Sequence, residues 1–502
     1  MKRLLPRAAL VGLALVPLGW AVAEAQGYRL RLDSRVQRVG YRGVTADSIP
    51  VGDVVTGPTG GFRTPDGFAV RCPPGSGHCF FFRPGPVLNG GPMVTTADLT
   101  LWGLGIRGLS ARVNGRLGFD LGSDDVWPGT EPAAQLVEAY AEYARRRFTL
   151  RGGRQLLVNR LGIVGFDGGR ATVPVGATGV ELDGYVGLGL ARATALPPSS
   201  PALDPLDDFQ PRSRQVLAGA AVGYRGRLGD VRLDYQREVD RDTRNFVSER
   251  AALAVDFYPV ERWSVAAAVD YDLANTWFGN ADATLRYNSP WITLTGGLRQ
   301  YRPHFDLWTI WGAFSPVPYH AVNAGIRIRP LRAVEVRARW ERYAFSTTET
   351  QTPLVDVDDD GWRVGIGVSY APVPALRLDA GYREEYGPGA SSNGFEGSVS
   401  WLVMPALSLT GYGSTLDRPL EFRFEEASVD VIGFDAEWSP ADRLRLSLGG
   451  ARYSEARDRP DAAAFDWDQT RLHARVTLLF RSETDALPLP PALRRRPPAG
   501  AR

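Results

Sequence analysis

Apolar and polar residues alternate along almost the whole chain, and this two-residue period limits the fold more than any other feature. Within residues 332–345 the two faces are Val334, Val336, Ala338 and Trp340 on one side and Glu335, Arg337, Arg339 and Glu341 on the other. The same division recurs in residues 263–272, 322–329 and 376–383. A period of two indicates β-strands, and residues 28–480 contain no convincing apolar stripe at the 3.6-residue helical period. The sequence therefore predicts an all-β protein.

Alternation alone fits both a soluble β-sandwich and a membrane barrel. The alternating units are about 10 to 14 residues long, which suits a tilted strand that crosses a bilayer better than a strand of a globular sheet. Their polar faces are heavily charged, as expected of a wall that faces water. These features favour a transmembrane antiparallel up-and-down β-barrel.

Connections between the units are short at one end and long at the other. The short ones are predicted at 107–108, 145–147, 176–179, 226–229, 258–262, 288–290, 330–332, 371–374, 404–406 and 439–442, with Tyr224, Tyr258, Trp263, Tyr287, Trp291, Tyr370, Trp401 and Trp438 beside them. The long ones are predicted at 41–92, 122–132, 193–213, 303–317, 347–360, 386–391, 417–425 and 456–464. Short periplasmic turns with an aromatic girdle and long extracellular loops are typical of bacterial outer-membrane barrels.

Counting between these connections gives about 22 strands, with 18 to 22 compatible with the ambiguous segments 41–92, 166–178 and 425–438. The barrel is expected to occupy residues 26–480. Its last strand ends with apolar residues at alternate positions up to Phe480, which resembles the signal that such barrels present to the barrel-insertion machinery. Residues 481–502 are predicted to form an extended Pro/Arg-rich periplasmic tail.

The first 25 residues predict export. Lys2, Arg3 and Arg7 precede an apolar stretch, and an Ala-x-Ala site ends at Ala25. This pattern indicates a signal peptide. Together with the predicted barrel, it indicates that the mature chain lies in the outer membrane of a Gram-negative bacterium, in contact with its lipid. In an oxidising compartment Cys72 and Cys79 can form a disulfide, whereas a zinc site would need more ligands than His78 alone.

The polar faces predict a charged lumen. The candidate pore-lining residues are Arg299, Arg327, Arg329, Arg337, Arg339, Arg363 and Arg377 together with Glu138, Glu142, Asp183, Asp270 and Asp272. Arginines concentrate in residues 286–383, and acids in 138–183 and 234–282. Such a wall is either a mixed, charge-paired surface or two facing walls of opposite sign that orient dipolar solutes.

The positions of two long loops decide whether the predicted pore is narrowed. The Gly/Pro-rich loop 41–92 forms a constriction if it folds inward and a surface feature if it folds outward, and the sequence leaves both open. Loop 303–317 carries Trp308 and Trp311, which suit an outer-leaflet girdle or, alternatively, a constriction or a platform for sugars.

Other functional classes have little support. Asp356, Asp358 and Asp360 begin like a calcium loop, but Gly367 stands where the bidentate glutamate belongs. There are four histidines, no G-x-S-x-G elbow, no H-E-x-x-H and no Walker loop, so no enzyme and no cofactor are expected. No basic stripe with interleaved aromatics suggests nucleic acid as a partner.

A family resemblance is local. Within residues 148–173, Gly153, Arg154 and Gln155 are followed by Phe166, Asp167, Gly168 and Arg170. This stretch resembles the strand, loop and returning strand of porin-like barrels of the alginate-export type, whose GRQ segment precedes an FDG-x-R element. The resemblance implies an outer-membrane channel more than it implies alginate.

Together these patterns predict an outer-membrane porin-like channel for passive diffusion of small hydrophilic solutes. The alternatives are a closed or plugged barrel with a surface-binding or structural role, and a soluble periplasmic β protein. A measurement of open conductance would separate the channel from the closed or plugged barrel. Partition of the chain with outer membranes would exclude the soluble periplasmic protein.

Overall fold

The structure is a computed structural model in which strands make up nearly all of the regular structure. It describes residues 27–57, 61–122, 134–190, 215–241, 244, 246–302, 318–346, 360–387, 391–420, 427–457 and 467–482. Among these, no helix is long and apolar enough to cross a membrane.

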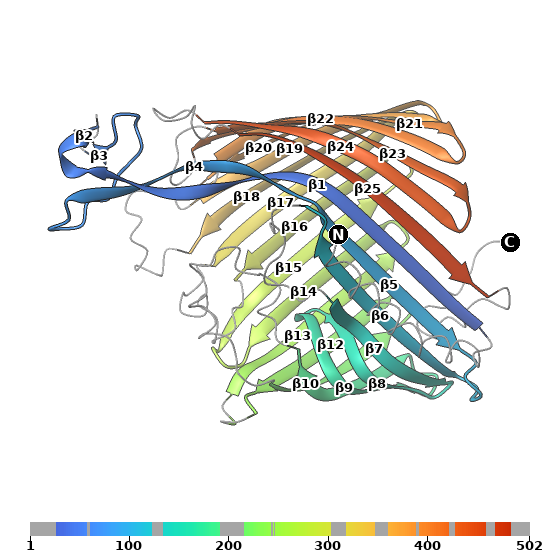
Figure 1. The fold of residues 1–502 in the computed structure, drawn as a ribbon. Coiled ribbons are helices and arrows are strands. Elements are labelled where there is room, and N and C mark those ends of the chain that lie inside the picture. Colours follow the sequence, from blue (N-terminus) through green and yellow to red (C-terminus); the bar gives the residue numbers. More distant parts are fainter. Residues whose placement is uncertain are drawn as a thin grey trace.

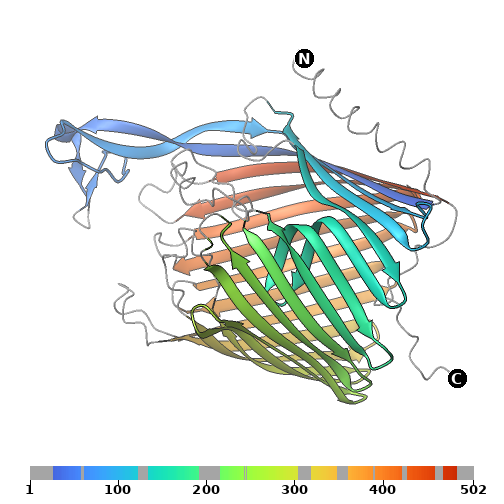
Figure 2. The same cartoon turned by 90° about the horizontal axis from the view of Figure 1, so that it is seen from below.

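The strands form a closed antiparallel barrel (Figures 1 and 2). The first half of its wall contains β1 (Gly27–Pro50), β5 (Pro92–Trp102), β6 (Leu109–Asp120), β7 (Ala134–Arg145), β8 (Phe148–Asn159), β9 (Gly162–Val175), β10 (Val180–Gly189), β11 (Val216–Arg225), β12 (Gly229–Val239), β13 (Phe246–Val260) and β14 (Trp263–Asp272). The second half contains β15 (Trp277–Asn288), β16 (Ile292–Tyr301), β17 (Tyr319–Leu331), β18 (Val334–Phe345), β19 (Asp360–Val373), β20 (Leu376–Tyr386), β21 (Ser391–Met404), β22 (Leu407–Leu420), β23 (Ala427–Ala441), β24 (Leu444–Arg457) and β25 (Trp467–Arg481).

The first strand closes the barrel. The main sheet has 23 strands, and removing β4 (His78–Gly90), which pairs with the second half of β1, leaves a wall of 22. The first half of β1 pairs with β5 on one side and with β25 on the other. The predicted fold class and strand number are therefore confirmed.

Segment 41–92 is more ordered than the loop that the sequence predicts. Residues 39–50 of β1 pair with β4 as a two-stranded ribbon, and a small hairpin of β2 (Val55–Thr56) and β3 (Phe62–Arg63) follows a 3₁₀ turn, η1 (Val51–Asp53). We call residues 39–90 the arm. Figures 1 and 2 show the arm extending away from the barrel, so it does not form a constriction inside it.

The arm has a stapled tip. A disulfide joins Cys72 to Cys79, whose side chain is fully buried. Phe68 stacks on Phe81 with ring centroids 5.7 Å apart, whereas Phe80 and Phe82 are exposed. Prolines are tolerated along this ribbon because both of its strands have an open edge.

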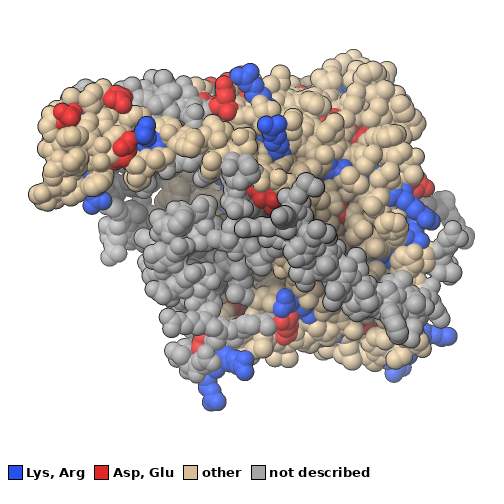
Figure 3. Space-filling model, in the orientation of Figure 1, with Lys and Arg blue, Asp and Glu red and all other residues tan. Residues whose placement is uncertain are grey.

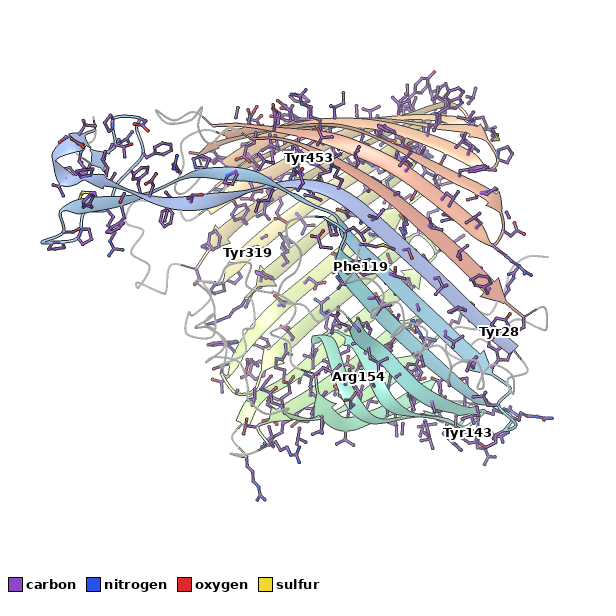
Figure 4. All side chains as sticks on the ribbon, in the orientation of Figure 1. Tyr28, Phe119, Tyr143, Arg154, Tyr319 and Tyr453 are labelled. Carbon is purple, nitrogen blue, oxygen red and sulfur yellow. A yellow bond between two sulfur atoms is a disulfide. The ribbon has the colours of Figure 1, made fainter. Side chains whose placement is uncertain are left out.

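All ten predicted short connections join consecutive strands at one end, within a few residues of their expected positions. The start of β1 and the end of β25 lie at this same end, as their antiparallel pairing requires. In Figure 4, Tyr28 and Tyr143 lie there, and Tyr319 lies toward the opposite end. The predicted aromatic residues next to these turns are largely exposed. Among them, Trp263 packs against Tyr287 with ring centroids 5.1 Å apart.

The outside of the wall is apolar. Exposed large side chains recur at alternate positions on each strand, for example Leu182 and Val186 on β10 and Leu294 and Leu298 on β16. Where described residues of the barrel are visible in Figure 3, most of their surface is accordingly uncharged. A band of this kind suits contact with lipid hydrocarbon.

Candidate functional site: the barrel lumen

The period of two assigns the charged side chains to the inner face of the wall. On β12, Leu233 is exposed to the outside while Asp234 and Gln236 are buried. On β16, Leu298 is exposed and the next residue, Arg299, forms an ion pair with Glu341 of β18. The lumen is therefore the polar compartment of this fold, as the alternation predicts.

The acidic sector of the wall, on β7 to β14, is charge-paired. Asp183 on β10 accepts hydrogen bonds from Arg170 on β9, and Arg232 on β12 lies between Asp183 and Asp234. Glu142 pairs with Arg151 at 2.6 Å, and Glu138 lies 3.4 Å from Arg112. Because the carboxylates are largely covered, they hold neighbouring strands together more than they contact lumen water.

Asp270 and Asp272 have local structural partners. Asp272 accepts hydrogen bonds from the backbone N–H groups of Ala274 and Asn275, both at 2.9 Å, and so caps the β14 to β15 turn. Asp270 accepts a hydrogen bond from the backbone N–H of Asn280. Both side chains are buried, so the structure places these two predicted pore-lining residues at a turn and between strands.

A belt of ion pairs crosses β16 to β20. Arg299 and Arg363 both donate to the same oxygen of Glu341, at 2.7 and 2.8 Å, and Arg363 also donates to Glu385 at 2.8 Å. Aromatic rings support the two cations, since Arg299 lies over Tyr319 and Arg363 over Tyr343. The shared carboxylates fix these side chains against the wall.

Nearer the short turns, arginines outnumber acids. A cavity of about 540 Å³ is lined by a group that we call the arginine cluster, namely Arg286, Arg327, Arg337, Arg339 and Arg383, with Glu396 as its acid. Arg327 shares Glu335 with Arg329, and Arg377 pairs with Asp379 nearby. The other four members form no salt bridge with any residue in the described part of the chain.

Glycines on β19 make room for the arginine cluster. Arg337 faces Gly367 and Arg339 faces Gly365 across the β18 to β19 pair. A Cβ atom at either glycine would lie 2.6 to 2.7 Å from the Nε atom of the facing arginine. The guanidinium groups therefore lie over bare backbone, and Val364, Ile366 and Val368 take the intervening positions on the same strand.

Most residues of the local GRQ and FDG-x-R motif come together at the base of the β8 to β9 hairpin, while Arg170 pairs with Asp183 of β10. Arg154 and Asp167 form a two-bond ion pair at 2.8 and 3.0 Å, and the Gln155 amide donates to the Gly168 carbonyl at 3.1 Å. Gly153 has a φ of 124°, and a Cβ there would lie 2.3 Å from the Ala139 carbonyl oxygen, so only glycine fits without a shift.

Beyond this base the hairpin leaves the wall. Pairing of β8 with β7 ends at Arg154, and pairing of β9 with β10 ends at Phe166. We call residues 155–166 the lumenal hairpin, because its side chains contact inner-face residues and its ribbons curve into the barrel, beside Arg154, in Figures 2 and 4.

A small apolar core fixes the lumenal hairpin. Leu157, Val164 and Phe166 pack with Tyr185 of β10 and Leu217 of β11, and all five are at most 7% exposed. Phe166 stacks on Tyr185 with ring centroids 5.5 Å apart, and the Tyr185 hydroxyl donates to Gln236 of β12 at 3.2 Å. Burial of these apolar side chains between the hairpin and the inner face of the wall holds the hairpin in place.

The tip of the lumenal hairpin reaches a distant strand. Arg160 in the two-residue turn forms an ion pair with Asp282 of β15 and is also within electrostatic reach of Asp270. Asp282 faces Arg299 in the strand register, so the tip of the hairpin lies next to the ion-pair belt. The resemblance of residues 148–173 implies a strand, a loop and a returning strand here but not the inward course, because the contact that fixes it joins residues far apart in the chain.

Several predicted features lie outside the described residues: the signal peptide, Trp308 and Trp311, Asp356 and Asp358, and the tail after Ser482. Asp360 is described, and it pairs with Arg342 at 2.6 Å. In the described part of the chain, no group of three or more His, Cys, Asp or Glu side chains is placed to hold a metal ion.

Comparison with known proteins supports the fold. No protein-family model and no curated protein matches the chain. Among solved structures, the ferric enterobactin receptor PfeA of Pseudomonas aeruginosa aligns at a TM-score of 0.51 and 10% identity, over 90% of this chain and 80% of that one. At this identity the likeness concerns the barrel fold alone.

Other similar structures are outer-membrane porins. OccAB2 of Acinetobacter baumannii aligns at a TM-score of 0.40 and 11% identity over 90% of this chain and 98% of that one. OprD of P. aeruginosa aligns at 0.38 and 10% over 92% and 98%. The resemblance of residues 148–173 to alginate-export porins is not shown by these matches and stays a prediction.

Proposed function

We propose that this protein is an outer-membrane porin-like channel through which small hydrophilic solutes diffuse passively. The observation that carries the proposal is a closed 22-strand wall that is apolar outside and charged inside. A barrel of this strand number encloses far more space than its inward side chains fill. Outer-membrane lipid around the apolar band and the insertion machinery at assembly are the partners that this function requires.

The arginine cluster supports a preference for anions. Four of its guanidinium groups lack a salt bridge to the described residues, whereas the acids of the opposite sector are covered and paired. Positive charge that remains accessible to lumen water raises the local concentration of anions, and this effect weakens as salt increases. Small carboxylates or phosphates are therefore favoured over cations of similar size.

Single-channel recording of the refolded chain in a planar bilayer tests the proposal, with heat-modifiable gel migration as the check of folding. In a salt gradient we expect discrete steps and a reversal potential on the anion side. The variant Arg337→Glu, Arg339→Glu should lower the anion-to-cation permeability ratio by roughly threefold or more, because four charge units change within the lumen.

A matched control places the same charge change outside the lumen. Arg63→Glu, Arg71→Glu alters two arginines of the arm and should leave selectivity unchanged. A folded wild-type barrel that gives no steps would contradict the channel. Steps whose selectivity is the same in both double variants would contradict the role of the arginine cluster.

A further inference from the structure

We propose that the lumenal hairpin is the constriction of this pore and sets the size limit for solutes. The inference rests on the proposed channel function and adds the element that makes it selective by size. The arm, to which the Gly/Pro content of the sequence draws attention, extends away from the barrel and leaves this role to residues 155–166.

The extent of the hairpin supports a constriction. Its tip pairs with β15, and the strand order from β9 to β15 makes six of the 22 steps around the wall. At about 4.8 Å per step, the strands that hold its base and its tip lie roughly 29 Å apart along the wall. Residues 155–160 extend at most about 20 Å, so the hairpin and the Arg160 side chain cross the lumen as a chord in front of about a quarter of the wall.

The hairpin is held at three separate places. The Arg154 and Asp167 pair closes its base, the apolar core with Tyr185 and Leu217 fixes its middle, and the Arg160 and Asp282 pair fixes its tip. An element anchored in this way keeps a constant position, which a size limit requires.

The side that faces away from the wall is what a solute meets. Val158 and Ile163 are 72% and 66% exposed, while Gln155, Leu157 and Val164 on the other side are at most 5% exposed. In the strand register Val158 and Ile163 face one another. They form an apolar patch beside the charged belt, where a solute contacts both kinds of surface.

The register of the hairpin allows a clean removal. Gln155 and Phe166 face one another, so residues 156–165 can be replaced by Asn-Gly, a two-residue turn suited to tight hairpins. We expect the single-channel conductance of the shortened barrel to be at least roughly 1.3 times that of the wild type, in line with the share of the wall that is uncovered. Polyethylene glycols of graded size, added as probes, should enter it at a larger molecular size.

Charge reversal at the tip tests the latch without shortening the chain. Arg160→Asp and Asp282→Arg should each raise conductance or current noise toward the shortened barrel, because each places like charges together. The double variant Arg160→Asp, Asp282→Arg should restore wild-type steps, which a general loss of folding would not allow. Arg452→Asp, Asp468→Arg, a reversed pair at the end of β24 and β25, is the matched control and should change neither readout.

The outcomes separate the two proposals. A conducting wild type whose shortened variant has the same conductance and the same polymer cut-off overturns the constriction and leaves the channel intact. A silent wild type with a conducting shortened variant overturns passive diffusion in the native chain and supports the hairpin as the obstruction.

Discussion

At the scale of single residues, glycine decides where charge can lie on the inner wall. Gly365 and Gly367 leave bare backbone beneath Arg339 and Arg337, and Gly153 permits the bend from which the lumenal hairpin departs. A strand rich in glycine is weaker than one of β-branched residues. Here the outward Val364, Ile366 and Val368 supply the strand preference, while the inward glycines provide space for guanidinium groups.

A second residue-scale feature is the seam where the first and last strands meet. Asp33 of β1 accepts hydrogen bonds from Arg475 at 2.6 and 2.9 Å and from the Thr477 hydroxyl at 3.0 Å, all from β25. Asp33→Asn removes the charge from this group. We expect the free energy of unfolding to fall by about 1 kcal/mol, since the pair is half-exposed to lumen water.

Urea unfolding of the barrel in lipid vesicles, followed by tryptophan fluorescence, measures this change. Asp468→Asn is the control, because Asp468 lies on β25, the strand that also carries Arg475, while its pair with Arg452 of β24 is well exposed. If Asp33→Asn lowers the free energy of unfolding no more than Asp468→Asn does, the Asp33 charge does not stabilise the pairing of β1 with β25.

At the scale of elements, the sequence predicts what local chemistry determines. The ten short turns and the strands beside them follow from turn residues and a two-residue period, and they lie where expected. The arm and the lumenal hairpin do not follow, because distant contacts fix them. Residues 41–50 continue β1 only through pairing with β4, and Arg160 is placed by Asp282. The sequence predicts Arg337 and Arg339 as pore-lining residues of an arginine-rich region, whereas the glycines that face them follow only from the strand register.

The arm gives an element-scale prediction. Cys72 and Cys79 close a loop with a sequence separation of 7. The variant Cys72→Ser, Cys79→Ser should therefore lower the free energy of local unfolding of the tip by roughly 2 kcal/mol. Hydrogen exchange should rise in residues 51–81 and stay unchanged in the barrel strands. Heat-modifiable migration is expected to match the wild type. Faster exchange in β5 or β25 would show that the arm supports the wall and is not an independent appendage.

At the scale of the whole molecule, the two faces of the wall differ in polarity, and the proposed function places lipid at the outer face and water at the inner one. The outer face carries exposed leucine, valine and aromatic side chains, and the inner face carries the ion pairs. The same arginine substitution should therefore have different costs on the two sides. A soluble barrel with water on both sides would show little difference.

Leu298→Arg and Asn323→Arg test this contrast on neighbouring strands. Leu298 is 61% exposed on the outer face of β16, away from both strand ends, and an arginine there should lower the free energy of unfolding by about 2 to 4 kcal/mol in lipid vesicles. Asn323 on β17 faces Glu341 in the register, so an arginine there enters lumen water beside an acid and should cost under about 1 kcal/mol. Equal losses for the two variants would contradict the assignment of the outer face to lipid. In detergent, whose shell is thinner and more deformable than a bilayer, the difference between the two variants should shrink.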